Sequence, residues 1–217
     1  MGELNHCCVT GNTRVWTVEG IKTFKELAES NDDVNVYCLD GDGNLKISKM
    51  FHPRISGYNI KIVKITLEDG TVLNASYNHM FLTKDGYVSA EDLFEDDEIV
   101  VLKDELNVPT EIDEYDKKFT DCVGTKKGTL IKTCEVTGNE FECSWEEREI
   151  CSKDGYEPDM YNIRTSINTM SDNYEYLSIV SVEFNDVSEN VYNGTVAVYH
   201  NYFTVDEKTG MKINQFN

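Results

Sequence analysis

Two residues of this sequence, far apart along the chain, are of types that can make and break peptide bonds. Cys8 lies directly before a strand-like run, and a thiolate is a strong nucleophile when its surroundings activate it. Asn217 is the last residue, and an asparagine side-chain amide can attack its own backbone carbonyl and so cut the chain after itself. Each residue alone has a plainer interpretation, because a cysteine before a buried strand is more often a small core residue.

Two of the four histidines lie beside apolar strand patterns. His79 follows Ser76 by three residues, with Asn78 between them, and His200 follows a similar pattern near the end of the chain. An imidazole can hold a carbonyl or protonate a leaving amine near neutral pH. A lone histidine is more often structural, so only their arrangement with Cys8 and Asn217 would point to chemistry.

The elements that would position these residues are short strands. β-branched and aromatic runs recur, separated by turns rich in Gly, Asn and Asp, which predicts an all-β fold built from hairpins. Residues 23–30 and 89–94 are predicted as single helical turns, the second with Ser89 as its N-cap. The clearest strand-like runs are 14–18, 34–39 and 60–67, and the clearest turns are 40–44, 68–70 and 84–86.

Composition limits the classes of function. The 20 basic and 40 acidic residues give a net charge of -20, which argues against a nucleic-acid or anionic-membrane partner. No apolar run approaches the ~20 residues needed to cross a bilayer, and the first residues do not form a signal peptide, so we expect a cytoplasmic protein. The seven cysteines are then expected to be free thiols.

Taken in order, these features resemble the intein family. In that family a first block starts with Cys, a second carries Thr-x-x-His, a late block carries Val-Tyr-Asp and then His-Asn-Phe, and a final strand ends in Asn. The matching residues are Cys8, Thr13 and Val15; Ser76, Tyr77, Asn78 and His79, with Ser in place of Thr; Val191, Tyr192 and Asn193, then His200, Asn201 and Phe203; and the strand 211–217 ending in Asn217.

The resemblance implies a fold and a division of the chain. The fold would be the all-β HINT horseshoe of hairpins, with two pseudo-symmetric halves that bring both chain ends to one site. The expected parts are an upstream extein or cloning remnant at 1–7, an N-terminal splicing half at 8–102, an insertion at 103–175, and a C-terminal splicing half at 176–217.

The resemblance also implies autocatalytic protein splicing by a mini-intein. Cys8 would attack the carbonyl of Cys7 to form a thioester, while His79 protonates the departing amine and Ser76 and Asn78 place its ring. A Cys, Ser or Thr after Asn217 would take the acyl group. Asn217 would then cyclise with help from His200, and the flanking exteins would be joined.

This activity is a single-turnover self-processing, not that of a turnover enzyme. It implies no cofactor and no bound metal. The expected partners are the exteins of an unidentified host protein, with no nucleic acid and no membrane, and the domain is expected to be a monomer. As written, the sequence carries no downstream nucleophile after Asn217, so we expect the first step alone.

Two positions depart from the family pattern. Phe216 stands where a penultimate histidine is common, so His200 is expected to assist Asn217 alone. Asn193 replaces the usual Asp of the late block, and an amide can form hydrogen bonds but cannot act as a base. Cys7 is an alternative nucleophile, although the spacing to Thr13 favours Cys8.

The insertion differs from its surroundings. It is acid-rich, holds four of the seven cysteines and has no histidine, which argues against an active homing endonuclease. Residues 133–141 resemble a zinc-ribbon hairpin in which Thr137 replaces the second cysteine. Cys134, Cys143 and Cys151 supply at most three of the four ligands of a structural zinc, which predicts a degenerate ribbon without metal. An ordinary hairpin stays an open alternative.

Three other classes remain to be separated. A hedgehog-type autoprocessing domain would use Cys8 and His79 with an external nucleophile, but would give no reason for the final strand to end in Asn217. A cysteine hydrolase using the same two residues would turn over added peptides. A non-catalytic β-rich binding module would show no thiol-dependent loss of residues 1–7.

Overall fold

The computed structural model describes residues 8–40, 43–103, 108–112, 130–133, 140–143, 173–196 and 199–216. Nearly all of the regular structure in these ranges is antiparallel β-sheet, as predicted. The strands in chain order are β1 Val9–Thr10, β2 Arg14–Thr17, β3 Gly20–Thr23, β4 Val34–Leu39, β5 Leu45–Leu67, β6 Val72–Ser76, β7 Met80–Thr83, β8 Gly86–Ser89, β9 Glu98–Leu102, β10 Leu130–Thr133, β11 Glu140–Cys143, β12 Tyr174–Val196, β13 Asn201–Val205 and β14 Lys212–Phe216; α1 is Phe24–Ser30 and η1 is Ala90–Asp92.

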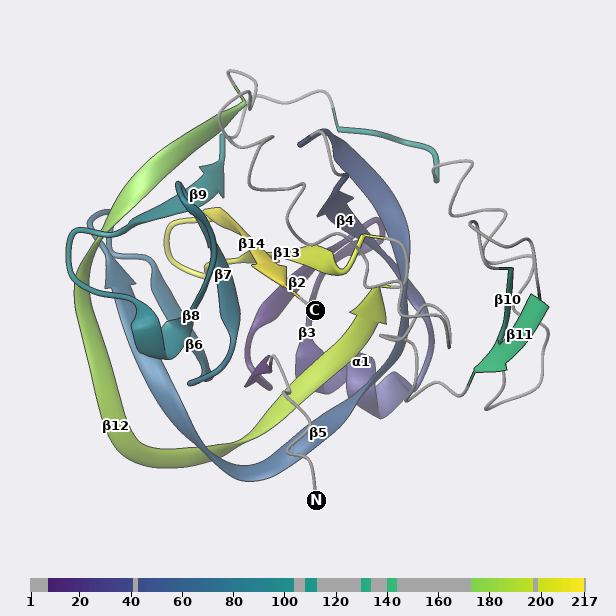
Figure 1. The fold of residues 1–217 in the computed structure, drawn as a ribbon, viewed down its shortest axis with the longest axis horizontal. Helices are drawn as coiled ribbons and strands as arrows, with labels where there is room; N and C mark the ends of the chain where they lie inside the picture. Colours follow the sequence, from purple (N-terminus) through teal and green to yellow (C-terminus); the bar gives the residue numbers. More distant parts are fainter. Residues whose placement is uncertain are drawn as a thin grey trace.

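Two long strands form the backbone of the fold. β5 and β12 each run for 23 residues and pair antiparallel from Ile179 opposite Leu67 to Val196 opposite Met50. Several register shifts interrupt their ladder, and such irregularities increase local twist and bend the strands. The two strands sweep together around one side of the molecule as a curved ribbon (Figure 1). Only the last third of β5, residues 60–67, was predicted as a strand.

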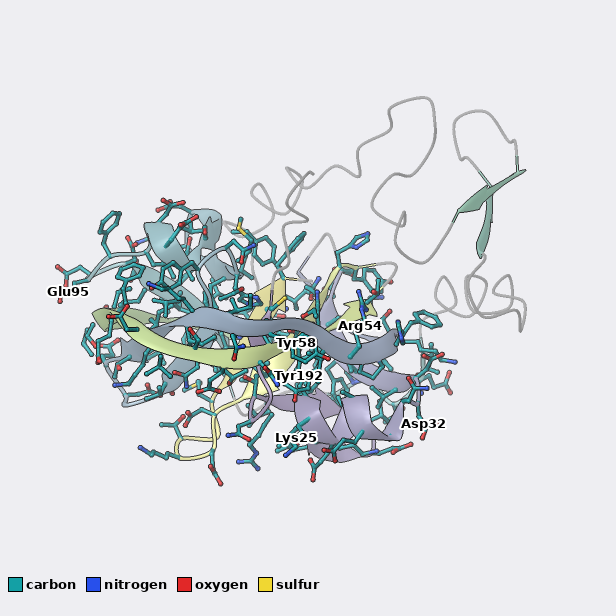
Figure 2. The ribbon with its side chains drawn as sticks, turned by 90° about the horizontal axis from the view of Figure 1, so that it is seen from below. Lys25, Asp32, Arg54, Tyr58, Glu95 and Tyr192 are labelled. Carbon is teal, nitrogen blue, oxygen red and sulfur yellow. The ribbon has the colours of Figure 1, made fainter. Side chains whose placement is uncertain are left out.

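The long ribbon carries two groups of shorter elements. β4, β2 and β13 lie on one side of the strand order, with α1 nearby, while β14, β9, β7 and β8 continue it on the other. Figure 2 shows Lys25 and Asp32 on the α1 side and Glu95 at the opposite end, with Arg54, Tyr58 and Tyr192 along the ribbon between them. This horseshoe of hairpins is the predicted HINT arrangement.

The single helix begins where the sequence indicated. Thr23 accepts a hydrogen bond from the amide of Glu26, and the Glu26 carboxylate accepts one from the amide of Thr23, which is a capping box. Phe24 and Leu27 are buried and fix the helix on the core. The second predicted turn is also present as η1, but the Ser89 hydroxyl makes no cap bond. It donates instead to the carbonyl of Tyr77 (3.0 Å), so the predicted N-cap was wrong in its bonding.

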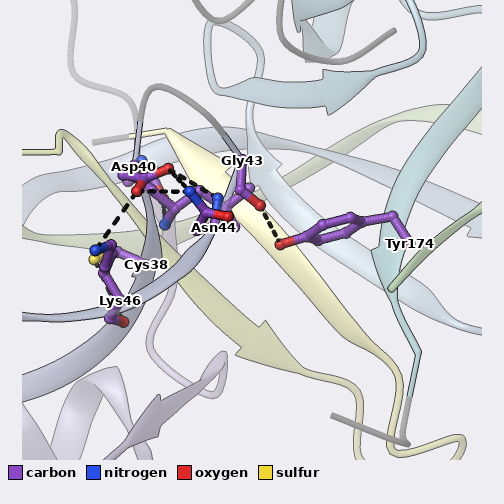
Figure 3. A network of polar contacts seen from close by, with 8 residues as sticks. Cys38, Asp40, Gly43, Asn44, Lys46 and Tyr174 are labelled. Carbon is purple, nitrogen blue, oxygen red and sulfur yellow. Dashed lines mark hydrogen bonds and ion pairs between the residues drawn. The ribbon is translucent and has the colours of Figure 1, made fainter. Parts of the chain in front are cut away.

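The point where β12 begins is anchored to the turn between β4 and β5. The Tyr174 hydroxyl donates to the carbonyl of Gly43 (2.9 Å), and the Asp40 carboxylate accepts from the Asn44 backbone and side chain and lies 3.7 Å from the Lys46 ammonium (Figure 3). Burial raises the pKa of Tyr174, so this hydroxyl stays a donor. The second half therefore resumes at Tyr174, two residues before the predicted start.

Little of the predicted insertion falls within the described residues. β10 and β11 form a separate two-stranded sheet, in which Leu130 lies opposite Cys143 and Thr133 opposite Glu140. A hairpin was predicted here, but Cys134 and Cys151 lie outside the described residues, so the metal-free ribbon stays a prediction. In the part of the chain that the structure describes, no group of three or more His, Cys, Asp or Glu residues could hold a metal ion. No helix in that part is long and apolar enough to cross a bilayer.

Candidate active site

Cys8 is fixed through its backbone. It precedes β1, a two-residue strand placed between β6 and β12, and its own side chain is fully buried. The carbonyl of Cys8 accepts from the amide of Ser76 (2.9 Å) and from the Ser76 hydroxyl (3.1 Å). The amide of Cys8 donates to the same hydroxyl oxygen (3.3 Å). Ser76 therefore contacts both backbone groups of the predicted nucleophile.

The Cys8 thiol lies in an apolar pocket with one polar neighbour. Its Sγ is 3.0 Å from the Oγ of Ser56, which also donates to the carbonyl of Val191 (3.3 Å). Burial raises the pKa of Cys8 to about 11, and the Ser56 hydrogen bond and the Arg54 charge offset only part of this rise. At neutral pH the thiol is therefore protonated, and it needs a base to become a nucleophile.

His79 lies in the turn that follows β6. Its amide donates to the carbonyl of Ser76 (3.0 Å), and its carbonyl accepts from the amide of Ala90 (2.7 Å), so the backbone on both sides is held. The ring is completely buried, with its Nε2 2.7 Å from the Oε1 of Gln215 and its centroid 4.9 Å from that of Phe81. Of the two residues predicted to place this ring, Ser76 acts on the backbone turn, and its hydroxyl bonds the Oδ1 of Asn78 (2.9 Å).

Gln215 was missed by the sequence analysis. It lies on β14, two residues before Asn217, and it is opposite Phe81 of β7. The signal was present, because a polar side chain interrupts the apolar final strand at a position where the neighbouring residues are buried. An unpaired amide there would be costly, so a partner had to exist.

His200 lies in a bend directly before β13. Its φ is +53°, in the left-handed region that non-glycine residues seldom adopt, and its amide donates to the carbonyl of Val196 (2.9 Å). Its neighbour Asn201 is opposite Phe216, the last described residue of β14. A sparsely populated backbone conformation next to a strand end is typical of functional sites.

Asn201 ties this bend to the rest of the fold, and it too was matched only as a motif residue. Its Oδ1 accepts from the amide of Leu39 (2.7 Å) and its Nδ2 donates to the carbonyls of Leu39 (2.9 Å) and Tyr199 (2.7 Å). The Nδ2 of Asn214 also donates to Asn201 Oδ1 (2.8 Å), and Tyr87 donates to Asn214 Oδ1 (2.6 Å). All of these groups are buried or half-buried, so the network is protected from water.

Asn193 lies on β12, opposite Arg54 of β5. Its Oδ1 accepts from the amide of Gly194 (2.8 Å), which is a local bond within its own strand. The neighbouring Tyr192 pairs with Val9 of β1, and its ring lies so close to Gly11 that a Cβ there would be 2.7 Å from a ring carbon. Asn193 is thereby placed one residue from the strand that holds Cys8.

The structure brings the first and last described strands of the site together. Backbone bonds join Cys8 to Ser76 and Ser76 to His79, and the ring of His79 bonds Gln215 of β14. Cys7 and Asn217 lie outside the described residues, so the two scissile junctions stay predictions. The arrangement is that of a self-processing HINT domain, with a buried thiol, a buried imidazole and the final strand at one site.

Comparison with known families gives the class a family. Residues 15–208 match the family model "Intein splicing domain", and the chain belongs to this family. Its class of activity is autocatalytic protein splicing, and the fold matches that of mini-inteins. The crystal structure of a DnaB intein from Synechocystis sp. superposes with a TM-score of 0.58 over 97% of this chain and 99% of that one, at 13% identity. The TvoVMA intein superposes with a TM-score of 0.54 over 95% and 96%, at 14% identity.

Similar sequences also occur within much longer proteins. The chain is 29% identical over 111 residues to the replication factor C small subunit of Methanocaldococcus jannaschii, which is 49% of this chain and 6% of that protein. It is 29% identical over 94 residues to the tRNA-splicing ligase RtcB of the same organism, or 43% of this chain and 10% of that protein. A DNA gyrase of Synechocystis sp. gives a similar match, 30% identical over 100 residues, or 44% of this chain and 9% of that protein. The chain thus spans a tenth or less of the length of these relatives.

Proposed function

We propose that Cys8 and Asn217 are the two splice-junction residues of this intein, with His79 and His200 assisting them. The observation that carries the proposal is the bonded path from Cys8 through Ser76 and His79 to Gln215 of β14. This path links the start of the chain to the strand that leads to Asn217. It supports one site for both ends of the reaction.

At the first junction, the Cys8 thiol attacks the carbonyl carbon of Cys7. The new C–S bond replaces the C–N bond, and the proton lost by sulfur ends on the amine of Cys8. Because the thiol holds its proton at neutral pH, the transfer needs a base, and His79 is the imidazole linked to Cys8 through Ser76. Ser76 supports the step by holding the amide nitrogen that becomes the leaving group.

At the second junction, a Cys, Ser or Thr after Asn217 takes the acyl group from Cys8. The side-chain nitrogen of Asn217 then attacks its own carbonyl, forms a cyclic imide and releases the following amine. His200 supports this step, since its neighbour Asn201 pairs with Phe216, the residue before Asn217. Asn193 supports the first strand through its place beside Tyr192.

The flanking exteins of a host protein are the partners in this proposal, and the reaction takes no cofactor. The division into splicing halves at 8–102 and 176–217 with an insertion at 103–175 belongs to the same proposal. The acidic composition supports a monomer without a nucleic-acid or membrane partner, and the cysteine content supports the reducing cytoplasm.

The test is the intact mass of the chain extended by one serine or cysteine after Asn217. Incubation with a thiol reductant near neutral pH should remove residues 1–7 from the wild type and leave a Cys8→Ala variant whole. An Asn217→Ala variant should keep the first cleavage and lose release of the extension. Cleavage before Cys8 with no release in the wild type would support the hedgehog-type alternative, and neither event would refute the proposed function.

A further inference from the structure

We propose that Gln215 and Thr204 set the tautomer of His79, with the proton on Nε2, and that Gln215 is a positioning residue for the first step of splicing. The proposal rests on the role of His79 given above, and it concerns a residue that acts only through His79. It deepens that role by naming what prepares the ring for proton transfer.

Three side chains and one carbonyl form a directional row of hydrogen bonds. The Thr204 hydroxyl donates to the carbonyl of Ile213 (3.3 Å). The Thr204 oxygen accepts from Nε2 of Gln215 (2.8 Å), and Oε1 of Gln215 lies 2.7 Å from Nε2 of His79. Each bond in the row determines the direction of the next one.

The row selects one orientation of the Gln215 amide. If the amide were turned over, its oxygen would face Thr204 and its NH2 group would face His79. Thr204 would then have to donate to Gln215, and the carbonyl of Ile213 would lose that donor. With the hydroxyl committed to Ile213, the NH2 group faces Thr204 and a carbonyl oxygen faces the ring. A carbonyl oxygen can only accept, so Nε2 of His79 carries the proton.

Burial makes this choice firm. His79, Gln215 and Thr204 are 0%, 2% and 3% exposed, so bulk water does not compete for their bonds. The register also holds the group together, because Thr204 lies opposite Ile213, and Gln215 lies opposite both Tyr202 of β13 and Phe81 of β7. The row contains no charged side chain, so it orients a neutral imidazole.

The tautomer decides which ring nitrogen can act as a base. With the proton on Nε2, Nδ1 carries the lone pair. Nδ1 can accept the proton of the Cys8 thiol as the C–S bond forms and return it to the Cys8 amine as the C–N bond breaks. The Gln215 carbonyl stabilises the transient imidazolium through its dipole. With the opposite tautomer, Nδ1 would present a proton where a base is required.

The inference separates Gln215 from its neighbours in the chain. Gln215 lies two residues before Asn217, so a local role in the last step would slow release of a C-terminal extension. The row predicts instead that changing Gln215 slows the first step, which takes place at the other end of the sequence. This split between the two steps is a readout that a merely structural role would not produce.

Three variants of the extended chain test the row. Gln215→Met keeps the length of the side chain but removes both bonds, and should slow cleavage at Cys8 about 10- to 100-fold, by analogy with the loss of partners that orient functional histidines. Gln215→Glu keeps an acceptor on Nε2 and should retain most of the rate. Thr204→Val removes the lock on the amide and should give a smaller loss than Gln215→Met.

Thr83→Val is the matched control. Thr83 is a buried threonine of β7 whose hydroxyl donates to the carbonyl of Gly86 (2.7 Å), outside the row. The same substitution there should leave the rate at Cys8 unchanged. The melting temperature of each variant shows that it is folded under the assay conditions.

The tautomer itself is read by long-range proton–nitrogen correlation of 15N-histidine in a Cys8→Ala background, which cannot process. The wild-type row should give a protonated Nε2 and an unprotonated Nδ1, and Gln215→Met should give a mixture. A protonated Nδ1 in the wild-type row, or an unchanged rate in Gln215→Met, would overturn the inference while leaving the proposed function intact. If the wild type forms no thioester at all, the proposed function fails first and the role of Gln215 fails with it.

Discussion

The hydroxyl oxygen of Ser76 lies 3.3 Å from the amide nitrogen of Cys8 and 3.1 Å from its carbonyl oxygen. One side chain therefore contacts the leaving group of the proposed first step and the next peptide unit of the same residue. Because the hydroxyl has one proton and also lies 2.9 Å from Asn78 Oδ1, that proton is shared between two acceptors. The contact gives the amide nitrogen an acceptor that orients it.

Removing this hydroxyl should slow the first step. We expect Ser76→Ala to reduce thiol-dependent cleavage before Cys8 by about tenfold, since a lost hydrogen bond of ordinary strength is worth about 1 kcal/mol. Ser76→Thr keeps the hydroxyl and restores the residue that the family pattern carries, so it should react at about the wild-type rate. The measurement is the intact mass as a function of time.

Ser89→Ala is the control for Ser76→Ala. Ser89 also donates to a backbone carbonyl, that of Tyr77, but it does not contact Cys8. Its rate of cleavage should match the wild type. Equal slowing in both serine variants would show that the effect comes from the β7–β8 region as a whole and would contradict the assigned role of Ser76.

The Cys8 thiol should make folding stability depend on alkaline pH. Burial raises its pKa from 9.0 to about 11, so an unfolded chain releases this proton at lower pH than the folded chain does. The stabilisation is fully present below pH 9 and is lost as the pH rises through 11. Relative to Cys8→Ser, the wild type should lose about 1 to 3 kcal/mol of unfolding free energy across this window.

Urea denaturation under reducing conditions at pH 8 and at pH 10.5 measures this loss. Burial also raises the pKa of Tyr87 and Tyr174, but both tyrosines are present in both proteins, so their effects cancel in the difference. A stability difference between wild type and Cys8→Ser that stays constant from pH 8 to pH 10.5 would show that the thiol is not desolvated.

Much of this site could be predicted because its chemistry is local in sequence. Cys8 and His79 each lie in a short motif whose order along the chain was informative, and the capping box at Thr23 is a three-residue pattern. The length of β5 could not be predicted in the same way. It contains Pro53, Gly57 and a left-handed Asn59, which are usually read as breaks, and only the pairing with β12 carries the strand through them.

The partners of the histidines escaped for a different reason. Gln215 lies 136 residues from His79, and Asn201 lies 162 residues from Leu39, so no spacing rule connects them. A polar residue in an apolar strand indicates that a partner exists but not which one. That choice is made by the register of β14 against β7 and β13, which depends on the whole sheet.

Asn201 should be needed both for stability and for the second step. Asn201→Ala would leave the amide and carbonyl of Leu39 and the Nδ2 of Asn214 without this buried partner. We expect a loss of about 2 to 4 kcal/mol of unfolding free energy. Because Asn201 also holds Tyr199 beside His200, release after Asn217 should slow more than cleavage before Cys8.

Tyr87→Phe is the graded control for this network. It removes one hydrogen bond, to Asn214 Oδ1, and should cost about 1 kcal/mol. Both rates are compared well below each melting temperature, so that unfolding does not contribute. If Asn201→Ala slowed both cleavages equally, the network would support the fold without positioning His200.

Restoring a histidine before Asn217 should accelerate the second step. The ring of Phe216 packs edge-to-face on Tyr87, with centroids 5.1 Å apart, and its side chain is only half-buried, so an imidazole fits in its place. Phe216→His would add a proton donor beside the Asn217 carbonyl, and we expect release of a C-terminal extension to rise about tenfold, at the low end of general acid catalysis. Phe216→Leu tests the packing alone and should leave the rate within about twofold. In a His200→Ala background, Phe216→His should recover part of the lost rate; no recovery would mean that His200 acts on Asn217 through geometry that a penultimate histidine cannot replace.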